Sequence, residues 1–290
     1  MDGSGDEKVS KYMARDTKSV ELSDEVRLPY VEQGDDSGVP VLLLHGFASS
    51  WRSFEPVLQH LPESIHAFAL TQRGHGEASK PAGGYHLRDL AADVAAFMDA
   101  LQIETAVVVG HSMGSAVAQR FAADHPEKTL GLVLAGACVT WPDDPDVRAF
   151  WDSTVSKLSD PIDPGFLSSF GEGLFAQPIP QATFKALVED VHKVPARVWK
   201  ALWKGRLEED LLGELDQIRA PALIVWGDRD ARCPRGDQEA LAEAIPDSRL
   251  LVYPGAGHEL HVEEPERFAS DLVAFVEDRA LEMIGRDYEA

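Results

Sequence analysis

Three segments of the sequence carry residue types that could together perform nucleophilic catalysis. The first is Gly-His-Ser-Met-Gly at 110–114, which stands directly after an apolar run and before a helix-like pattern. A sharp turn from strand to helix strains its central residue and needs small neighbours. The helix behind such a turn contributes a free backbone N–H and a positive dipole end where an oxyanion would develop. We therefore predict that Ser112 is a nucleophile.

The other two segments supply a base and an acid. A serine hydroxyl is a weak nucleophile until a base removes its proton, and the base needs an orienting acid. The apolar run 222–226 leads into Gly-Asp-Arg-Asp, and the run 250–253 leads into Pro-Gly-Ala-Gly-His. Serine, aspartate and histidine thus follow three separate apolar runs. This order predicts His258 as the base and Asp230 as the acid.

His261 and Asp228 are the alternatives for these two roles. The small residues at 255–257 favour His258, because they let a loop at a strand end bend inward. We expect His261 to be a capping or surface histidine. Asp230 lies farther into its loop than Asp228, which we expect to cap the turn or pair with the arginine between them.

A further turn could supply the oxyanion hole. Leu-His-Gly-Phe at 44–47 follows the apolar run 41–44. The backbone N–H groups of Phe47 and Met113 are the predicted donors, and a donor of this kind typically contributes about 3 kcal/mol. We expect His45 to bridge backbone groups and hold the loop.

The apolar runs alternate with helix-spaced patterns. Short, wholly apolar runs are typical of strands that are buried on both faces. Their alternation with helices predicts an α/β fold with a doubly wound, mostly parallel sheet. The predicted strands lie at 41–44, 65–70, 106–109, 130–134, 222–226 and 250–253 after an antiparallel hairpin over 20–31, and the predicted helices lie at 87–101, 115–123 and 265–277.

The alternation stops between residues 139 and 212. Helix-spaced apolar residues at 184–191 and 198–203 are interrupted there by prolines, which indicates short helices inserted between two strands. Such an insertion belongs over the carboxyl ends of the strands, where open α/β sheets hold their ligands. We therefore divide the chain into a flexible N-terminal tail at 1–18, a core at 19–138 and 213–290, and a helical cap at 139–212.

The predicted cap is rich in aromatic residues. Short helices enclose little core of their own, so part of this apolar surface should face Ser112 and form a mostly apolar pocket. We expect the basic residues of the cap to be solvated, which favours a neutral, apolar substrate of modest size. For such a substrate kcat/KM should rise with acyl-chain length until the pocket is full. The candidate pocket residues are Trp141, Phe170, Phe175, Trp199 and Trp203.

The amino-acid composition disfavours some classes of binding partner. The chain has 27 basic and 49 acidic residues, a net charge of −22, which disfavours nucleic acid and anionic membrane surfaces. The polar N-terminus does not resemble a signal peptide, and no apolar run approaches the ~18 residues of a membrane span, so we expect a cytoplasmic protein. No ligand spacing indicates a metal, and no cofactor is expected. Nothing in the sequence predicts the oligomeric state.

Together these segments resemble the α/β-hydrolase superfamily over about residues 20–280. The resemblance implies an eight-stranded sheet with an antiparallel second strand and a helical cap after strand six. It also places the acid three residues after a glycine, which favours Asp230. Thr71 departs from the family, where many relatives have Asp, and Ser115 stands where many have Gly; we expect both to be structural. The matching segments are 45–47, 72–76, 110–114, 227–230 and 257–258.

The resemblance leaves several reactions open, because a fold does not settle a reaction. Our leading hypothesis is hydrolysis of a carboxylic ester or lactone through an acyl-enzyme on Ser112. A serine nucleophile disfavours haloalkane dehalogenases and epoxide hydrolases, which use Asp. Carbon–carbon bond hydrolases, cofactor-free haloperoxidases (perhydrolases) and hydroxynitrile lyases share the triad and stay open. A small-molecule receptor derived from a hydrolase is the alternative from another class.

The two cysteines, Cys138 and Cys233, follow strands that the superfamily's strand order makes neighbours. Their sulfurs could therefore lie close together near the pocket. We nevertheless expect free thiols, because a single pair in a cytoplasmic protein is usually unbridged.

Overall fold

The fold is seen in a computed structural model that describes residues 15–23, 25–139, 144–171 and 173–287, with side chains to residue 278. Most of the tail expected at 1–18 lies outside these ranges. Its described end is attached to the sheet: Lys18 begins the first strand, and the Arg15 guanidinium donates a hydrogen bond to Gln33 Oε1 at 2.5 Å. Lys18, the last residue of the expected tail, is thus paired with Tyr30 of the second strand.

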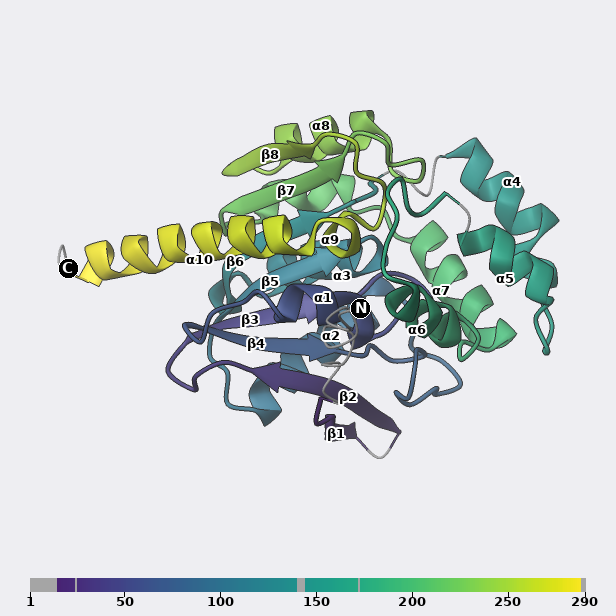
Figure 1. Ribbon diagram of the computed structural model, residues 1–290, viewed down its shortest axis with the longest axis horizontal. Coiled ribbons are helices and arrows are strands. Elements are labelled where there is room, and N and C mark those ends of the chain that lie inside the picture. Colours follow the sequence, from purple (N-terminus) through teal and green to yellow (C-terminus); the bar gives the residue numbers. More distant parts are fainter. Residues whose placement is uncertain (1–14, 24, 140–143, 172, 288–290) are drawn as a thin grey trace, which may run out of the picture.

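Eight strands form one sheet in the order β1-β2-β4-β3-β5-β6-β7-β8 (Figure 1). Strand β2 runs antiparallel to β1 and β4, and all other neighbours are parallel. The predicted eight-stranded, mostly parallel sheet with an antiparallel second strand is confirmed. The strands are β1 (Lys18–Ser23), β2 (Val26–Gln33), β3 (Val39–Leu44), β4 (Ile65–Leu70), β5 (Ala106–His111), β6 (Thr129–Ala135), β7 (Ala222–Gly227) and β8 (Ser248–Tyr253).

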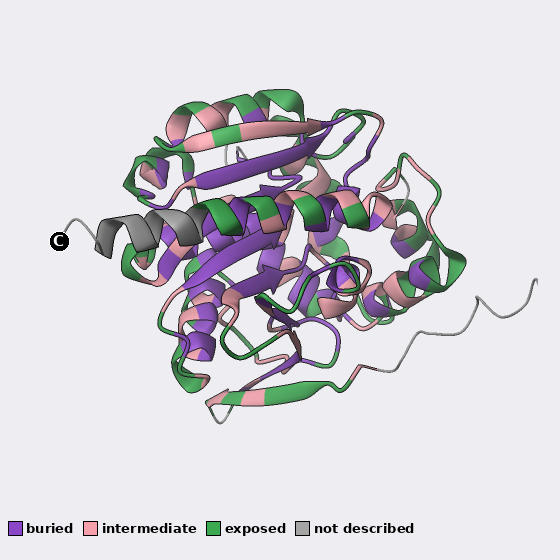
Figure 2. Ribbon diagram, turned by 60° about the vertical axis from the view of Figure 1, so that its left-hand side comes forward, coloured by how far each residue is buried: buried purple, intermediate pink, exposed green. Residues whose placement is uncertain are grey.

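Helices cover both faces of this sheet, which explains why the central strands read as continuous apolar runs. Successive residues of β3 point to opposite faces, so Leu42 and Leu44 join one apolar core while Val41 and Leu43 join the other. Figure 2 shows the central strands buried and the edge strand β1 largely exposed. Helices α2 (Leu87–Ala100), α3 (Met113–Asp124) and α8 (Arg235–Ala244) contribute to the first core, and α1 (Glu55–Leu58), α9 (Leu260–Glu263) and α10 (Pro265–Asp287) to the second.

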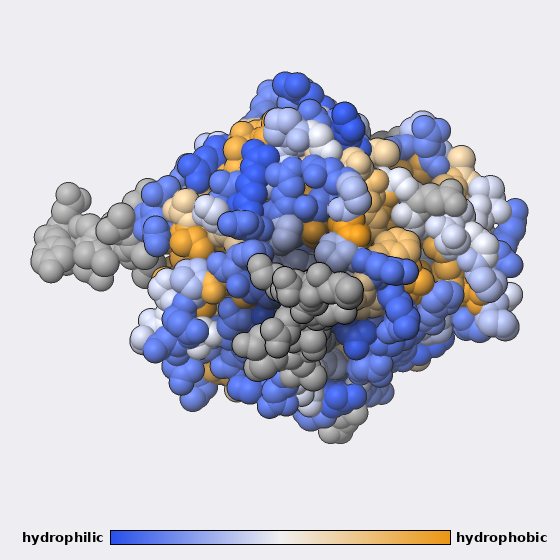
Figure 3. Space-filling view, viewed as in Figure 1, coloured by the Kyte–Doolittle hydropathy of each residue, from blue (hydrophilic) through white to orange (hydrophobic). Residues whose placement is uncertain are grey.

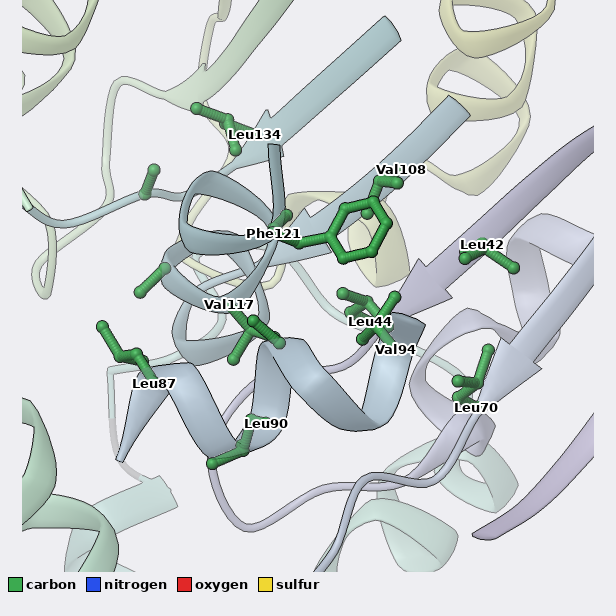
Figure 4. Packing of buried hydrophobic residues seen from close by; sticks show 14 of the residues in the cluster. Leu42, Leu44, Leu70, Leu87, Leu90, Val94, Val108, Val117, Phe121 and Leu134 are labelled. Carbon is green, nitrogen blue, oxygen red and sulfur yellow. The ribbon is translucent and has the colours of Figure 1, made fainter. Parts of the chain in front are cut away.

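The first core packs α2 and α3 against the central strands and so supports the region where β5 leads into α3. Val117 and Phe121 of α3 lie against strand residues such as Val108 and Leu134, next to the apolar face of α2 (Figure 4). Phe121 and Val108 are fully buried. Burial of this kind contributes roughly 1.5–3 kcal/mol per large side chain, so the start of α3, just after Ser112, rests on a rigid support.

A helical insertion separates β6 from β7 and stands at one end of the sheet, on the right in Figure 1. Its longest helix, α7, buries Val198, Trp199, Leu202 and Trp203, the helix-spaced set that the sequence contains. The insertion contains α4 (Pro145–Ser153), a 3-10 turn at Val155–Lys157, α5 (Pro164–Gly171), α6 (Gln181–Val191), α7 (Ala196–Glu208) and a 3-10 turn at Leu212–Gln217. Among the described residues, no helix combines the length and apolar character that crossing a bilayer requires.

Candidate active site

Ser112 occupies a sharp turn between β5 and α3. Its φ of 51° and ψ of −115° lie in a region that non-glycine residues rarely adopt, and such strain is typical of functional sites. The flanking glycines make the turn possible. A Cβ on Gly110 would lie 2.2 Å from the Gly114 carbonyl oxygen, and a Cβ on Gly114 would lie 2.1 Å from that of Leu44. The turn thus explains why a small residue is needed on each side of the serine.

The structure brings Ser112, His258 and Asp230 into one hydrogen-bonded chain. His258 Nε2 lies 2.9 Å from Ser112 Oγ, and His258 Nδ1 lies 2.9 Å from Asp230 Oδ2. The three residues come from the carboxyl ends of β5, β8 and β7, as the sequence predicts. A proton on Nδ1 that points at the carboxylate leaves the lone pair of Nε2 facing the hydroxyl, which is the arrangement a general base needs.

Burial and mutual pairing set the charge states of Asp230 and His258. Burial raises the pKa of Asp230, but the His258 charge and hydrogen bonds from His258 and from the backbone N–H groups of Cys233 and Arg232 outweigh it and lower that pKa below its usual value. Burial alone would lower the pKa of His258, whereas the Asp230 carboxylate raises it above the ordinary value. Asp230 is therefore a stable anion, and His258 binds a proton more readily than a histidine in water.

Two backbone N–H groups beside Ser112 fit an oxyanion hole. Met113 is the first residue of α3, where a helix has no internal acceptor for its N–H. Within the described part of the chain, neither the Phe47 nor the Met113 N–H donates to an acceptor. Gly46 lets the two turns approach, since a Cβ there would lie 3.3 Å from Ser112 Cβ and 2.7 Å from His111 Nδ1.

His45 holds this loop, as the sequence predicts. Its Nδ1 lies 2.7 Å from the Gly46 carbonyl oxygen, and its Nε2 accepts a 3.0 Å hydrogen bond from the Gln72 backbone N–H. Burial lowers its pKa to about 4, so the ring is neutral. Thr71, the departure from the family pattern, accepts a hydrogen bond from the Trp51 N–H, which agrees with a structural role.

The alternative acid and base are both placed elsewhere. Asp228 accepts a 2.6 Å hydrogen bond from the Gly255 N–H and so fastens one turn to the next, as expected. His261 is fully buried between the rings of Phe54 and His111, and the expectation of a capping or surface position is wrong. It follows His258 on a short helix, α9, that turns it toward the second apolar core.

Cys138 and Cys233 form a disulfide with Cα atoms 5.1 Å apart, and the expectation of free thiols is wrong. The reason is the pairing of β6 with β7, which places Ala135 beside Val225. Residues that follow the two strand ends therefore meet. The bridge joins the start of the insertion to the loop of Asp230, whose Oδ1 accepts the Cys233 N–H at 3.0 Å.

Two cavities meet at Phe47. The smaller one, of about 40 Å³, is the cavity at Ser112, which is lined by Ser112, Met113, Trp203 and apolar residues of α2. A larger one of about 410 Å³ opens between α5 and α6. Of the candidate pocket residues, Trp203 lines the first cavity, and Phe170 and Phe175 line the second. Trp199 lines neither, because its ring is packed against Phe47 and Phe170. Trp141 lies outside the described residues.

Arg206 is a site residue that the sequence analysis did not single out. It is buried beside the cavity at Ser112 and donates hydrogen bonds to the backbone carbonyls of Cys138, Val139 and Glu209. Burial lowers its pKa to about 10, so it stays charged. One arginine within a helical pattern carries no sequence signal of this role, which is to tie α7 to the strand end that leads into the insertion.

Several side chains could offer ligands to a metal. Among the described residues, three groups place possible ligand atoms within 4.8 Å of one another. One comprises Asp230, Cys233 and His258, which already engage in the hydrogen-bonded chain and the disulfide. Another comprises His111, Glu259 and His261, directly behind the candidate base. The third lies at Glu32, Asp36 and His66. That no metal is required stays a prediction, which elemental analysis of the purified protein would check.

Comparison with known proteins identifies the family of the chain. A model of the "Alpha/beta hydrolase family" matches residues 41–271. The pimeloyl-[acyl-carrier protein] methyl ester esterase of Chromobacterium violaceum is 29% identical, over 84% of this chain and 96% of its own. The 2-hydroxymuconate semialdehyde hydrolase of a Pseudomonas species is 28% identical, over 81% of this chain and 85% of its own. A solved esterase from Exiguobacterium antarcticum is 26% identical with a TM-score of 0.80, covering 90% of this chain and 99% of its own. The chain therefore belongs to the α/β-hydrolase family.

Proposed function

We propose that the protein hydrolyses a carboxylic ester or lactone of a small apolar substrate through an acyl-enzyme on Ser112. The observation that carries the proposal is the continuous hydrogen-bonded chain from Ser112 Oγ through His258 to Asp230, with 2.9 Å at each step. The strained turn at Ser112 and the two available N–H groups beside it support the same chemistry.

In this mechanism His258 Nε2 takes the proton of Ser112 as Oγ attacks the substrate carbonyl. The oxyanion that forms accepts hydrogen bonds from the Phe47 and Met113 N–H groups. Asp230 keeps the histidine tautomer and stabilises the imidazolium, which then gives its proton to the leaving alcohol. His258 next removes a proton from water, which attacks the acyl-enzyme and regenerates the serine.

The lining of the cavity at Ser112 favours a neutral substrate. Its residues are mostly apolar, and Tyr85 and Arg206, its ionisable residues besides the disulfide-bonded Cys138, both donate to backbone carbonyls. A carbon–carbon bond hydrolase, a perhydrolase or a hydroxynitrile lyase would use the same triad. Ester hydrolysis is preferred because two of the relatives compared above are named as esterases.

A panel of esters and lactones assayed with wild type and Ser112→Ala tests the proposal. Loss of a triad member typically costs ~10⁴-fold or more in rate, so the variant should be inactive while its circular dichroism is unchanged. Mass spectrometry should find an acyl adduct on Ser112. A variant that retains a tenth of the wild-type rate would contradict the mechanism.

The same panel separates an enzyme from a receptor. A receptor would stay occupied after one turnover, whereas an esterase should show repeated turnover without a lasting burst. That the protein is cytoplasmic and acts on a small molecule without nucleic acid or membrane partners stays a prediction, which cell fractionation and pull-down experiments would check.

A further inference from the structure

The larger cavity is a groove that is lined mostly by apolar side chains, some of which are exposed to solvent. Helix α6 directs Phe184, Leu187, Val188 and Val191 into it, at the spacing of one helix face. Phe184 is 47% exposed and Val188 is 39% exposed. Figure 3 shows apolar residues at the surface near the insertion, on the right of the view. A ligand that covered these exposed apolar side chains would remove them from water, and this burial would stabilise the complex.

The groove borders the candidate active site. It is lined by Phe47, whose N–H is a candidate oxyanion donor and whose side chain also lines the cavity at Ser112. It also includes Glu259, the residue after His258, although neither Ser112 nor His258 lines it. The groove therefore lies next to the reaction centre, on the side of the base.

The smaller cavity lies at Ser112 itself. Its walls come from α2, α3, α7, Phe47, Tyr85 and Cys138, and none of its lining residues belongs to the segment 254–263 that carries His258. Its volume of about 40 Å³ is roughly three times the minimum for one water molecule. A short acyl group is therefore the part of an ester that this cavity suits.

We propose that the cavity at Ser112 holds a short acyl group and that the groove holds a long, neutral alcohol moiety of the same ester. This inference rests on the proposed function and assigns its substrate class. The orientation follows from chemistry: the leaving oxygen must take its proton from His258 Nε2, so the alcohol must depart on the side of His258, where the groove lies. Glu259 and His192 are the ionisable residues along the groove, and its other walls suit a hydrocarbon.

Two matched ester series test the assignment. With ethanol as the alcohol, kcat/KM should stay level or rise from acetate to butanoate and fall at least tenfold at hexanoate. With acetate as the acyl group, kcat/KM should rise at least tenfold from the ethyl to the hexyl ester, because each fully buried methylene is worth up to about fourfold. Rankings that are reversed in both series would overturn the assignment.

The variant Val188→Asp places a charge in the groove at an exposed position. It should reduce the ratio of hexyl acetate to ethyl acetate turnover at least tenfold, whereas the control variant should keep the wild-type ratio. Ala182→Asp is the matched control, since it makes the same change of charge at an exposed residue of α6 outside the groove. Trp203→Leu, which enlarges the cavity at Ser112, should raise hexanoate turnover relative to acetate turnover.

Binding separates this inference from the proposed function. In the Ser112→Ala background, hexyl acetate should bind at least tenfold more tightly than ethyl acetate by calorimetry, and Val188→Asp should abolish the difference. If wild type hydrolyses no ester, the proposed function fails, while equal binding of the two esters would refute the groove assignment alone. A dimer that Val188→Asp dissociates without changing either ratio would assign the groove to a second copy and also overturn it.

Discussion

Replacing His261 by Phe should make the fold less sensitive to acid. His45, His75, His111 and His261 are fully buried, and burial lowers their pKa values to about 4 for the first and about 3 for the other three. In the unfolded chain each titrates near about 6.5. Above that pH both states are neutral. As the pH falls from there toward the folded pKa, only the unfolded chain binds the proton, so the free energy of unfolding decreases.

The magnitude follows from linkage. Between pH 7.5 and pH 5.5 each such histidine lowers the free energy of unfolding by about 1.4 kcal/mol, and four lower it by about 5 kcal/mol, as much as the whole stability of some domains. His261→Phe removes one of these contributions. Both ring nitrogens of His261 lack a hydrogen-bond partner among the described residues, and its neighbours include Phe54 and Phe268. The variant should therefore also gain about 1–3 kcal/mol at pH 7.5, because no unsatisfied polar group is left buried.

Urea unfolding of wild type and His261→Phe at the two pH values measures the difference, which should be about 1.4 kcal/mol less acid destabilisation in the variant. Equal acid destabilisation of the two proteins would refute the conclusion that His261 is buried and neutral. Ester turnover by the variant should stay within about threefold of wild type, since His258 and not His261 contacts Ser112. A loss of turnover as deep as that of His258→Ala would make His261 the base.

Three further predictions concern the acid, the base and the cysteines. Asp230→Asn should lower turnover around 10⁴-fold through the wrong histidine tautomer, whereas Asp228→Asn should mainly lower the thermal midpoint; the reverse outcome would exchange their roles. Because neutral His258 is the active form and Asp230 raises its pKa, kcat/KM should fall as the pH drops through an apparent pKa above 6.5; a pH profile checks this, and a flat one down to pH 5 would contradict it. Thiol titration of the denatured, unreduced protein should find neither Cys138 nor Cys233 free, and Cys138→Ala should lower the free energy of unfolding by up to about 4–5 kcal/mol because the bridge closes a long loop; two free thiols would rule out the disulfide.

Local sequence patterns were enough to predict a mostly parallel sheet and the three residues at the carboxyl ends of its strands, whereas the eight strands and the antiparallel second strand were implied by the resemblance to the family. Strands buried on both faces must be apolar throughout, so 106–109, 222–226 and 250–253 are recognisable without a partner in view. Parallel strands end at the same edge, and the residues after those ends must therefore converge. This is why Ser112, Asp230 and His258 could be grouped before the fold was known.

Tertiary structure decided which of two nearby histidines contacts Ser112 and whether the two cysteines are bonded. His258 and His261 are three positions apart, and only the direction of α9 sends the second into the core beside Phe54. Cys138 and Cys233 were expected near one another, but bonding depends on a Cα separation of 5.1 Å that no sequence pattern encodes.

The division of the insertion's aromatic residues is also a tertiary property. Trp199 and Trp203 lie one helical turn apart on the same buried face of α7, yet the first fills the interior of the insertion and the second lines the cavity at Ser112. Helical periodicity fixes which side chains turn away from solvent. Whether such a side chain meets another helix or a cavity depends on how distant segments pack. The residues that line the cavity are therefore decided by the tertiary structure and not by the local sequence.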